Sequence, residues 1–183
     1  MLEIRSLSEL SEASLRRAIR GYVSRQKYQV SYTSNEQATS FTLELVDLAA
    51  PYIHHFDPAE EDILHSQKAL EAGWSIGAFD GDELAAIAIA EPEKWNDTLR
   101  IWEFHVVESY RGEGIGRQMM ERLAERATLA GLRAMVVETQ NTNVPAIRFY
   151  RKAGFAIEGI DISLYTNHDY PDGEIAVFMK RRL

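Results

Sequence analysis

Glycines occupy alternate positions in the segment Arg111-Gly112-Glu113-Gly114-Ile115-Gly116. The segment follows a β-branched and aromatic run at residues 101–107, which predicts a strand, and it precedes apolar residues at helical spacing. Glycine lets the backbone bend without a Cβ clash, and the N–H groups and dipole of a helix N-terminus favour an anion. The spacing therefore predicts a loop that binds a phosphate, most naturally a pyrophosphate. A tight strand-to-helix turn without a ligand is the alternative.

Two other phosphate-binding loops fit this segment less well. A P-loop would end in Gly-Lys followed by Ser or Thr, whereas Gly116 is followed by Arg117. The dinucleotide fingerprint is the closer rival, because two glycines match it and Glu138 ends the next predicted strand, where a ribose-binding acid belongs. Its third glycine would fall at Arg117, however, and the second half of a short chain leaves no room for the usual six-stranded sheet.

A second motif follows the glycine loop, and it reads Asn143-x-x-Ala146-x-x-Phe149-Tyr150-x-x-x-Gly154-Phe155. Together with Arg111-x-x-Gly114-x-Gly116, it resembles the acetyl-CoA signature of the GNAT superfamily of N-acetyltransferases. Residues 138–146 and 174–178 are most similar to the streptothricin acetyltransferase branch. Residues 102–106 depart from the acidic Ile-Glu-Asp-Ile-like pattern of that branch, because they include Trp102 and His105.

The resemblance implies a fold class and a domain organisation. The fold would be α/β (α+β): the GNAT fold, with a single mixed and mostly antiparallel sheet, a splayed central pair of parallel strands, and flanking helices. Residues 1–183 would form a single N-acetyltransferase domain. Residues 1–72 would be a variable N-terminal part on the acceptor side, and residues 73–183 would be the acetyl-CoA-binding core.

The resemblance also implies how the cosubstrate acetyl-CoA is held. Backbone N–H groups of residues 112–117 would bind the pyrophosphate, and the strand at residues 104–106 would pair with the pantetheine arm. The N–H of Val106 would stabilise the oxyanion at the thioester oxygen, where one such donor is worth about 3 kcal/mol. Asn143 would bond the pantetheine or an active-site water. The implied cofactor-binding residues are Phe104, Val106, Arg111, Gly112, Glu113, Gly114, Ile115, Gly116, Arg117, Asn143, Ala146 and Tyr150.

Three residues are the catalytic candidates. Tyr150 matches the family's general acid, which would protonate the coenzyme A thiolate, although a half-buried helix tyrosine with some other partner is the alternative. Glu138, at the end of a central strand, is the first candidate for the general base, and Glu103 on the neighbouring strand is the second. The sequence has no cysteine, so an acyl-cysteine intermediate is impossible and direct attack of the amine is expected.

Local signals predict the elements that position these residues. An aspartate-glycine turn at Asp80-Gly81 joins strands at residues 74–79 and 83–91 into a hairpin. Helices are expected at residues 11–20, at 58–72, from Ile115 to Gly131, and from an Asn143 cap to Gly154. Further strands are expected at residues 132–138, 160–165 and 174–180, whereas residues 28–56 have no clear assignment.

Composition narrows the partners. The chain has 183 residues, 45% of them hydrophobic, and a net charge of −8, which disfavours nucleic acid and would attract a cationic substrate. No apolar run approaches the roughly 20 residues of a membrane helix, and a cytoplasmic location is expected. The histidines show no metal-binding spacing, so no metal is expected. The acceptor would be a small-molecule amine, with a peptide N-terminus or a non-catalytic acetyl-CoA sensor as alternatives, and a homodimer is common in this superfamily.

Overall fold

The computed structural model describes residues 2–183, and contacts within the chain divide it into two compact units. The first unit holds the N-terminal residues up to Arg20, residues 56–137 and residues 180–183. The second unit holds residues 21–55 and 138–179. Strands β7 and β9 each pass from one unit to the other. No described helix is long and apolar enough to cross a membrane.

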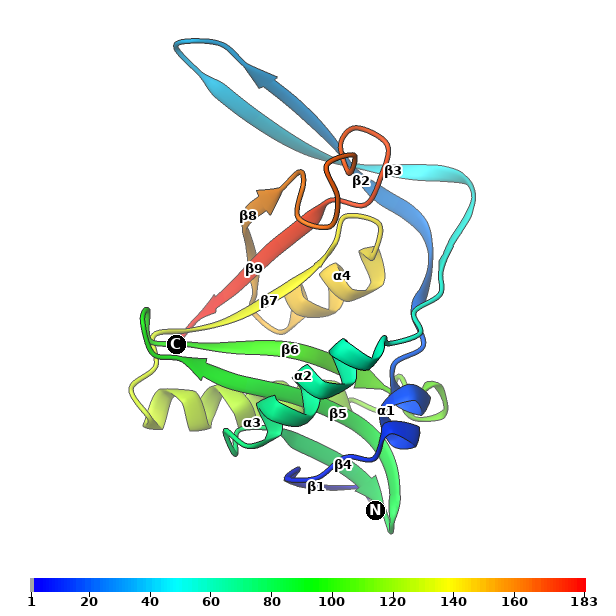
Figure 1. Ribbon diagram of the computed structural model, residues 1–183, viewed down its shortest axis with the longest axis vertical. Coiled ribbons are helices and arrows are strands. Elements are labelled where there is room, and N and C mark those ends of the chain that lie inside the picture. The colour runs from blue at the N-terminus through cyan, green and yellow to red at the C-terminus, as the bar shows by residue number, and fades with distance from the viewer. Residues whose placement is uncertain (1) are drawn as a thin grey trace. The chain divides into compact units, whose positions relative to one another are not determined.

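The first unit is a sheet with helices on both faces (Figure 1). Its strands follow the order β1-β4-β5-β6-β7, antiparallel except for the parallel pair β6–β7, so the predicted mixed, mostly antiparallel sheet is confirmed. The elements are β1 (Glu3–Ser6), α1 (Glu12–Ala18), α2 (Glu60–Leu70), β4 (Ile76–Asp80), β5 (Glu83–Glu93), β6 (Thr98–Val106), the 3-10 turn η1 (Glu108–Tyr110), α3 (Ile115–Leu129) and the start of β7 (Ala134–Gln140).

The two helices α1 and α2 cover one face of this sheet, and α3 covers the other (Figure 1). Leu15 of α1 and Ile63 of α2 are buried in one cluster with Ile87 and Ile89 of β5. Strand β5 is buried along most of its length because it has helices on both sides. It is therefore the fixed element against which its neighbour β6 is positioned.

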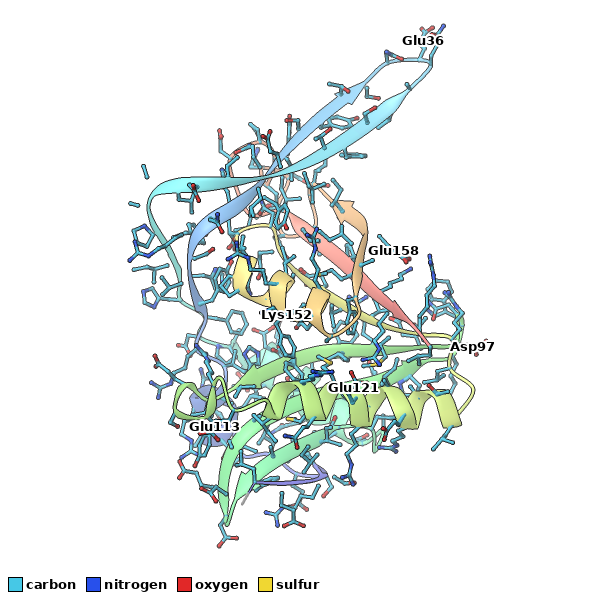
Figure 2. The ribbon with its side chains drawn as sticks, turned by 180° about the vertical axis from the view of Figure 1, so that it is seen from behind. Glu36, Asp97, Glu113, Glu121, Lys152 and Glu158 are labelled. Carbon is cyan, nitrogen blue, oxygen red and sulfur yellow. The ribbon has the colours of Figure 1, made fainter. Side chains whose placement is uncertain are left out.

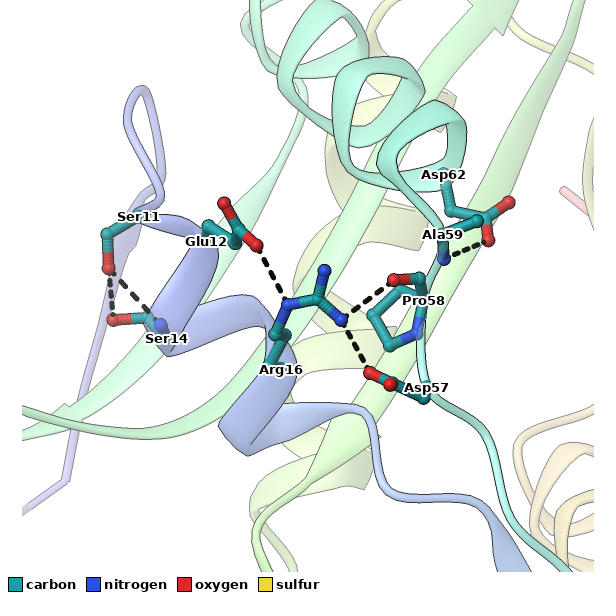
Figure 3. Close-up of polar contacts among 8 residues, drawn as sticks. All are labelled: Ser11, Glu12, Ser14, Arg16, Asp57, Pro58, Ala59 and Asp62. Carbon is teal, nitrogen blue, oxygen red and sulfur yellow. Dashed lines mark hydrogen bonds and ion pairs between the residues drawn. The ribbon is translucent and has the colours of Figure 1, made fainter.

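Arg16 ties α1 to the segment that leads into α2 (Figure 3). Its Nη1 donates to Asp57 Oδ1 at 2.5 Å and to the Pro58 carbonyl at 2.8 Å, and its Nε donates to Glu12 Oε1 at 2.9 Å. The N-terminus of α1 is capped by Ser11, whose Oγ accepts from the Ser14 N–H at 3.2 Å. These contacts hold both helices over the same face of the sheet.

The parallel pair is joined over only part of its length. The register runs from Thr98 opposite Ala134 to Ile101 opposite Val137, although β6 continues to Val106. A register shift on the other side of β6, beside Ile89, marks a bulge at the same level. The end of this pairing agrees with the predicted splay of the central strands.

The second unit contains a two-stranded ribbon, β2 (Tyr22–Ser34) with β3 (Thr39–His54). Figure 2 labels Glu36 at the tip of the ribbon, where the Asn35 N–H donates to the Ala38 carbonyl at 2.9 Å. The unit also contains the end of β7, α4 (Val144–Lys152), β8 (Ala156–Asp161) and the start of β9 (Ala176–Arg182), with strand order β7-β9-β8.

The sequence-based assignments are correct for most elements and wrong for one. Residues 28–56, left unassigned, form most of the ribbon. A strand was expected at residues 160–165, but β8 ends at Asp161 because turn chemistry begins there. Asp161 Oδ1 accepts from the Ser163 N–H at 2.9 Å, and Asp169 Oδ2 accepts from the Tyr165 N–H at 2.8 Å. Residues 162–165 therefore form a loop.

Candidate active site

The last residues of β6 present backbone groups away from β5. The Val107 N–H donates to the Ala85 carbonyl at 2.9 Å, so the backbone N–H of Val107 points toward β5. Backbone groups alternate along an antiparallel strand, which turns the N–H and C=O of Phe104 and Val106 the opposite way. The ladder with β7 has already ended at Ile101. This stretch of β6 is therefore a strand edge suited to pairing with an extended ligand.

Arg111 connects this edge to the glycine loop. Its Nε donates to the Val106 carbonyl at 3.0 Å, while its own N–H donates to the Glu108 carbonyl at 3.2 Å. The Arg111 side chain thus satisfies the Val106 carbonyl and fixes the direction of the chain where the loop begins. The Val106 N–H is a separate donor on the same edge.

The glycine loop forms an uncapped helix N-terminus. Gly112 has φ 87° and Gly114 has φ 81°, which L side chains rarely adopt, and Gly114 is the N-cap of α3 without a side-chain cap. A Cβ at either glycine would meet nothing within 4 Å, so space remains above the loop. Glu113 lies in this exposed loop ahead of α3 (Figure 2). The first N–H groups of α3, from Ile115 on, lack intrahelical partners, and an anion is their natural ligand.

Glu103 and His105 form a pair on one face of β6. The distance from His105 Nε2 to Glu103 Oε2 is 2.7 Å, and the two side chains are 26% and 22% exposed. They lie opposite Ile87 and Ile89, and directly opposed residues share a face. The pair therefore lies on the face of the sheet that α1 and α2 cover.

The second motif forms the start of α4 in the second unit. Asn143 is its N-cap, and its Oδ1 accepts from the Ala146 N–H at 3.2 Å, which leaves the amide nitrogen of Asn143 to face other partners. Tyr150 is buried in the last turns of the helix, at 7% exposure, with the rings of Phe149 and Phe155 beside it at 5.5 and 5.6 Å. The helix thus fixes the spacing of the motif's two polar residues.

Glu138 and Tyr165 are direct partners in the second unit. The Tyr165 hydroxyl donates to Glu138 Oε1. Burial first, and then the charge of Glu138, raises the pKa of Tyr165, so this hydroxyl stays protonated and remains a donor. Tyr165 was not identified from the sequence as a site residue, and it lies in the loop that was expected to be a strand.

A third carboxylate, Glu174, collects several partners in the same unit. Its Oε1 lies 2.7 Å from the Tyr22 hydroxyl, 2.8 Å from the Thr142 hydroxyl and 3.2 Å from His54 Nδ1. Burial first raises the pKa of Tyr22, and the charge of Glu174 adds to this effect. The sequence drew attention to Glu174 only through the resemblance of residues 174–178, and it gave no indication of these partners.

The candidate residues thus fall into two sets, one in each unit. The first unit brings together the β6 edge, Arg111, the glycine loop and the pair of Glu103 with His105. The second unit contains Glu138 at the end of β7, and Asn143, Ala146 and Tyr150 along α4. Among residues 2–183, no group of three or more His, Asp or Glu side chains is placed to hold a metal ion.

This fold and these motifs place the chain in a known family: it belongs to the acetyltransferase (GNAT) family, whose model matches residues 35–155. The superfamily expected from the two motifs is therefore confirmed.

Its relatives include two streptothricin acetyltransferases. The enzyme of Escherichia coli is 31% identical over 66% of this chain and 69% of its own length. That of Streptomyces lavendulae is 40% identical over 57% of this chain, and the match spans only about half (54%) of its own length. Among solved structures, a nourseothricin acetyltransferase matches with a TM-score of 0.77 and 28% identity, over 99% of this chain and 98% of that one.

Proposed function

We propose that the protein transfers an acetyl group from acetyl-CoA to a primary amine of a small cationic molecule, of the kind that streptothricin represents. The observation that carries this proposal is the strand edge at Val106, with the uncapped glycine loop after the short turn η1. An extended arm and a pyrophosphate in series are the features of coenzyme A that such a surface fits. Family membership and the names of the relatives support the same activity.

The residues of the first unit would hold acetyl-CoA, which supplies an activated acetyl thioester. The N–H groups at the start of α3 would bind the pyrophosphate, and the exposed positive-φ glycines would let the phosphates approach the backbone closely. Phe104 and Val106 would pair with the pantetheine arm. The Val106 N–H would donate to the thioester oxygen, while Arg111 holds the Val106 carbonyl.

Two side chains of the second unit would move the protons. Tyr150 would donate a proton to the departing thiolate, and Asn143 would orient the pantetheine or a water through its amide. Glu138 would take the proton from the attacking amine, directly or through a water. Glu103 is the alternative base; its carboxylate bonds His105, whereas that of Glu138 accepts from Tyr165.

The acceptor that we propose is a cationic antibiotic. The names of the relatives favour an antibiotic of the streptothricin type, and the net charge of −8 favours a cationic molecule. A peptide N-terminus is the second candidate acceptor, since a glutamate base and a tyrosine acid suit that reaction equally well.

A thiol-release assay with acetyl-CoA tests the proposal. Streptothricin, a polyamine and a short peptide are offered in turn to the wild type and to Tyr150→Phe. We expect turnover on streptothricin that falls at least about a hundredfold in Tyr150→Phe, as loss of a proton donor does, while the KM for acetyl-CoA stays within about twofold. Turnover on the peptide alone would replace the small-molecule acceptor, and a protein that neither binds nor consumes acetyl-CoA would overturn the proposal.

A further inference from the structure

Two aromatic side chains contact the carboxylate of Glu174, and a third ring lies beside them. The rings of Tyr22 and His54 stack with centroids 5.0 Å apart and planes 8° apart, and those of Tyr22 and Tyr52 lie 6.4 Å apart. Tyr22 and His54 also contact the carboxylate directly. Tyr52 lies beside the ring of Tyr22, and burial, followed by the charge of Glu174, raises the pKa of its hydroxyl. The three rings come from β2 and β3, so the ribbon builds most of this group.

Among residues 2–183, neither a lysine nor an arginine forms an ion pair with the Glu174 carboxylate. Its side chain is 21% exposed, and its ion-pair partner is His54. A largely buried carboxylate normally has a charged partner. Tyrosine rings attract a cation through their faces, and a carboxylate binds it through charge-assisted hydrogen bonds. The group is therefore suited to a cation that a ligand brings.

The carboxylate still has acceptor capacity for such a ligand. The contacts from Tyr22, Thr142 and His54 all fall on Oε1. A carboxylate offers about four lone-pair sites on two oxygens. An ammonium carries three donors and no acceptor, so it adds hydrogen bonds to the carboxylate without competing for the donors already there.

The cation in this place is not the amine that reacts. The proposed transfer assigns that amine to Glu138, which takes its proton, so Glu174 is left to hold an ammonium group that stays charged. We infer that Glu174, with the rings of Tyr22, Tyr52 and His54, binds a second ammonium group of the acceptor, one that is not acetylated. The inference rests on the proposed acetyl transfer and narrows its acceptor to molecules with two cationic amines.

Glu174→Gln tests this assignment with a matched pair of acceptors, 1,5-diaminopentane and 1-aminopentane. Thiol release gives kcat and KM, and calorimetry on the protein saturated with coenzyme A gives the affinity of each amine without turnover. We expect the wild type to prefer the diamine. Glu174→Gln should raise KM and Kd for the diamine by roughly tenfold to a hundredfold, the loss expected for a charged hydrogen-bonded contact. Both constants for the monoamine should stay within about twofold.

Two further variants make the result interpretable. Glu36→Gln, at the exposed tip of the ribbon (Figure 2), removes a carboxylate of the same unit and should change neither amine's constants. Tyr52→Leu removes one ring from the half-exposed part of β3 and should weaken binding of the diamine but not of the monoamine. This variant still tests the inference if Glu174→Gln does not fold. Thermal melting shows which variants are folded.

The outcomes separate the inference from the function on which it rests. A wild type that does not prefer the diamine, or a Glu174→Gln variant that loses both amines equally, overturns the role of Glu174 and leaves acetyl transfer standing. A wild type that does not bind acetyl-CoA and releases no thiol with any amine overturns the proposed function itself.

Discussion

Replacing Asn141 with alanine should be among the most destabilising single changes in the second unit. The side chain is 3% exposed and makes two hydrogen bonds to segments far apart in the sequence. Its Nδ2 donates to the Tyr28 carbonyl at 2.9 Å, and its Oδ1 accepts from the Ile175 N–H at 2.8 Å. Alanine supplies neither partner, so a buried carbonyl on β2 and a buried N–H next to Glu174 would both be left unsatisfied.

The expected magnitude follows from these two lost partners. A buried donor or acceptor without a partner costs about 1–3 kcal/mol, so Asn141→Ala should lower the free energy of unfolding by about 2–6 kcal/mol. A domain of this size has about 5–15 kcal/mol in total. At roughly 2–4 °C per kcal/mol, the melting temperature should fall by at least about 4 °C.

Differential scanning calorimetry measures the effect, and Asn35→Ala is its matched control. Asn35 also makes two hydrogen bonds, because its Oδ1 accepts from the N–H groups of Gln37 and Ala38 at 2.8 and 2.9 Å. It lies at the exposed tip of the ribbon, where water replaces lost partners, so its loss should cost less than about 1 kcal/mol. If both variants melt at the same temperature, the assignment of stability to the buried bonds of Asn141 is refuted.

Three further predictions concern the loop, a surface ion pair and the base. Gly114→Ala should raise the KM for acetyl-CoA in steady-state kinetics, because φ 81° costs an alanine about 1–2 kcal/mol although its Cβ meets no neighbour; an unchanged KM would contradict the role of the loop. The hydrogen bond from Arg181 lowers the pKa of Glu121, so this pair stabilises the fold above the ordinary pKa of 4.5 and is lost as the pH falls through the lowered value. The melting temperature of Glu121→Gln should therefore lie below that of the wild type at neutral pH and converge with it in acid, with a difference worth at most about 1 kcal/mol because the pair is partly exposed. Glu138→Gln should lower kcat by about a hundredfold or more with acetyl-CoA binding intact, and Glu103→Gln by clearly less; the reverse order would make Glu103 the base.

Local signals in the sequence were sufficient for the glycine loop and for the N-terminal cap of α4. The glycine spacing predicted the loop at Gly114, and an asparagine before a proline-containing turn predicted the cap at Asn143. Each signal concerns residues within one turn of each other, so it does not depend on the rest of the fold. The same holds for the hairpin at Gly81, whose φ of 60° matches the predicted turn.

The ribbon and the cluster around Glu174 could not be predicted, because their contacts join distant residues. Tyr28 pairs with Asn141 across more than a hundred positions, and nothing within residues 28–56 signals that partner. The cluster of Glu174 likewise depends on Tyr22 and Thr142, which share no local pattern with it. Long paired strands with mixed polar and apolar residues carry a weak sequence signal until their partners are known.

The most direct test of the account is transfer of an isotopically labelled acetyl group from acetyl-CoA to streptothricin, followed by mass spectrometry of the product. The account predicts a labelled acetyl group on an amine of streptothricin, formed in proportion to the coenzyme A released and suppressed in Tyr150→Phe. An unmodified antibiotic, together with no saturable binding of acetyl-CoA to the wild-type protein, would contradict it.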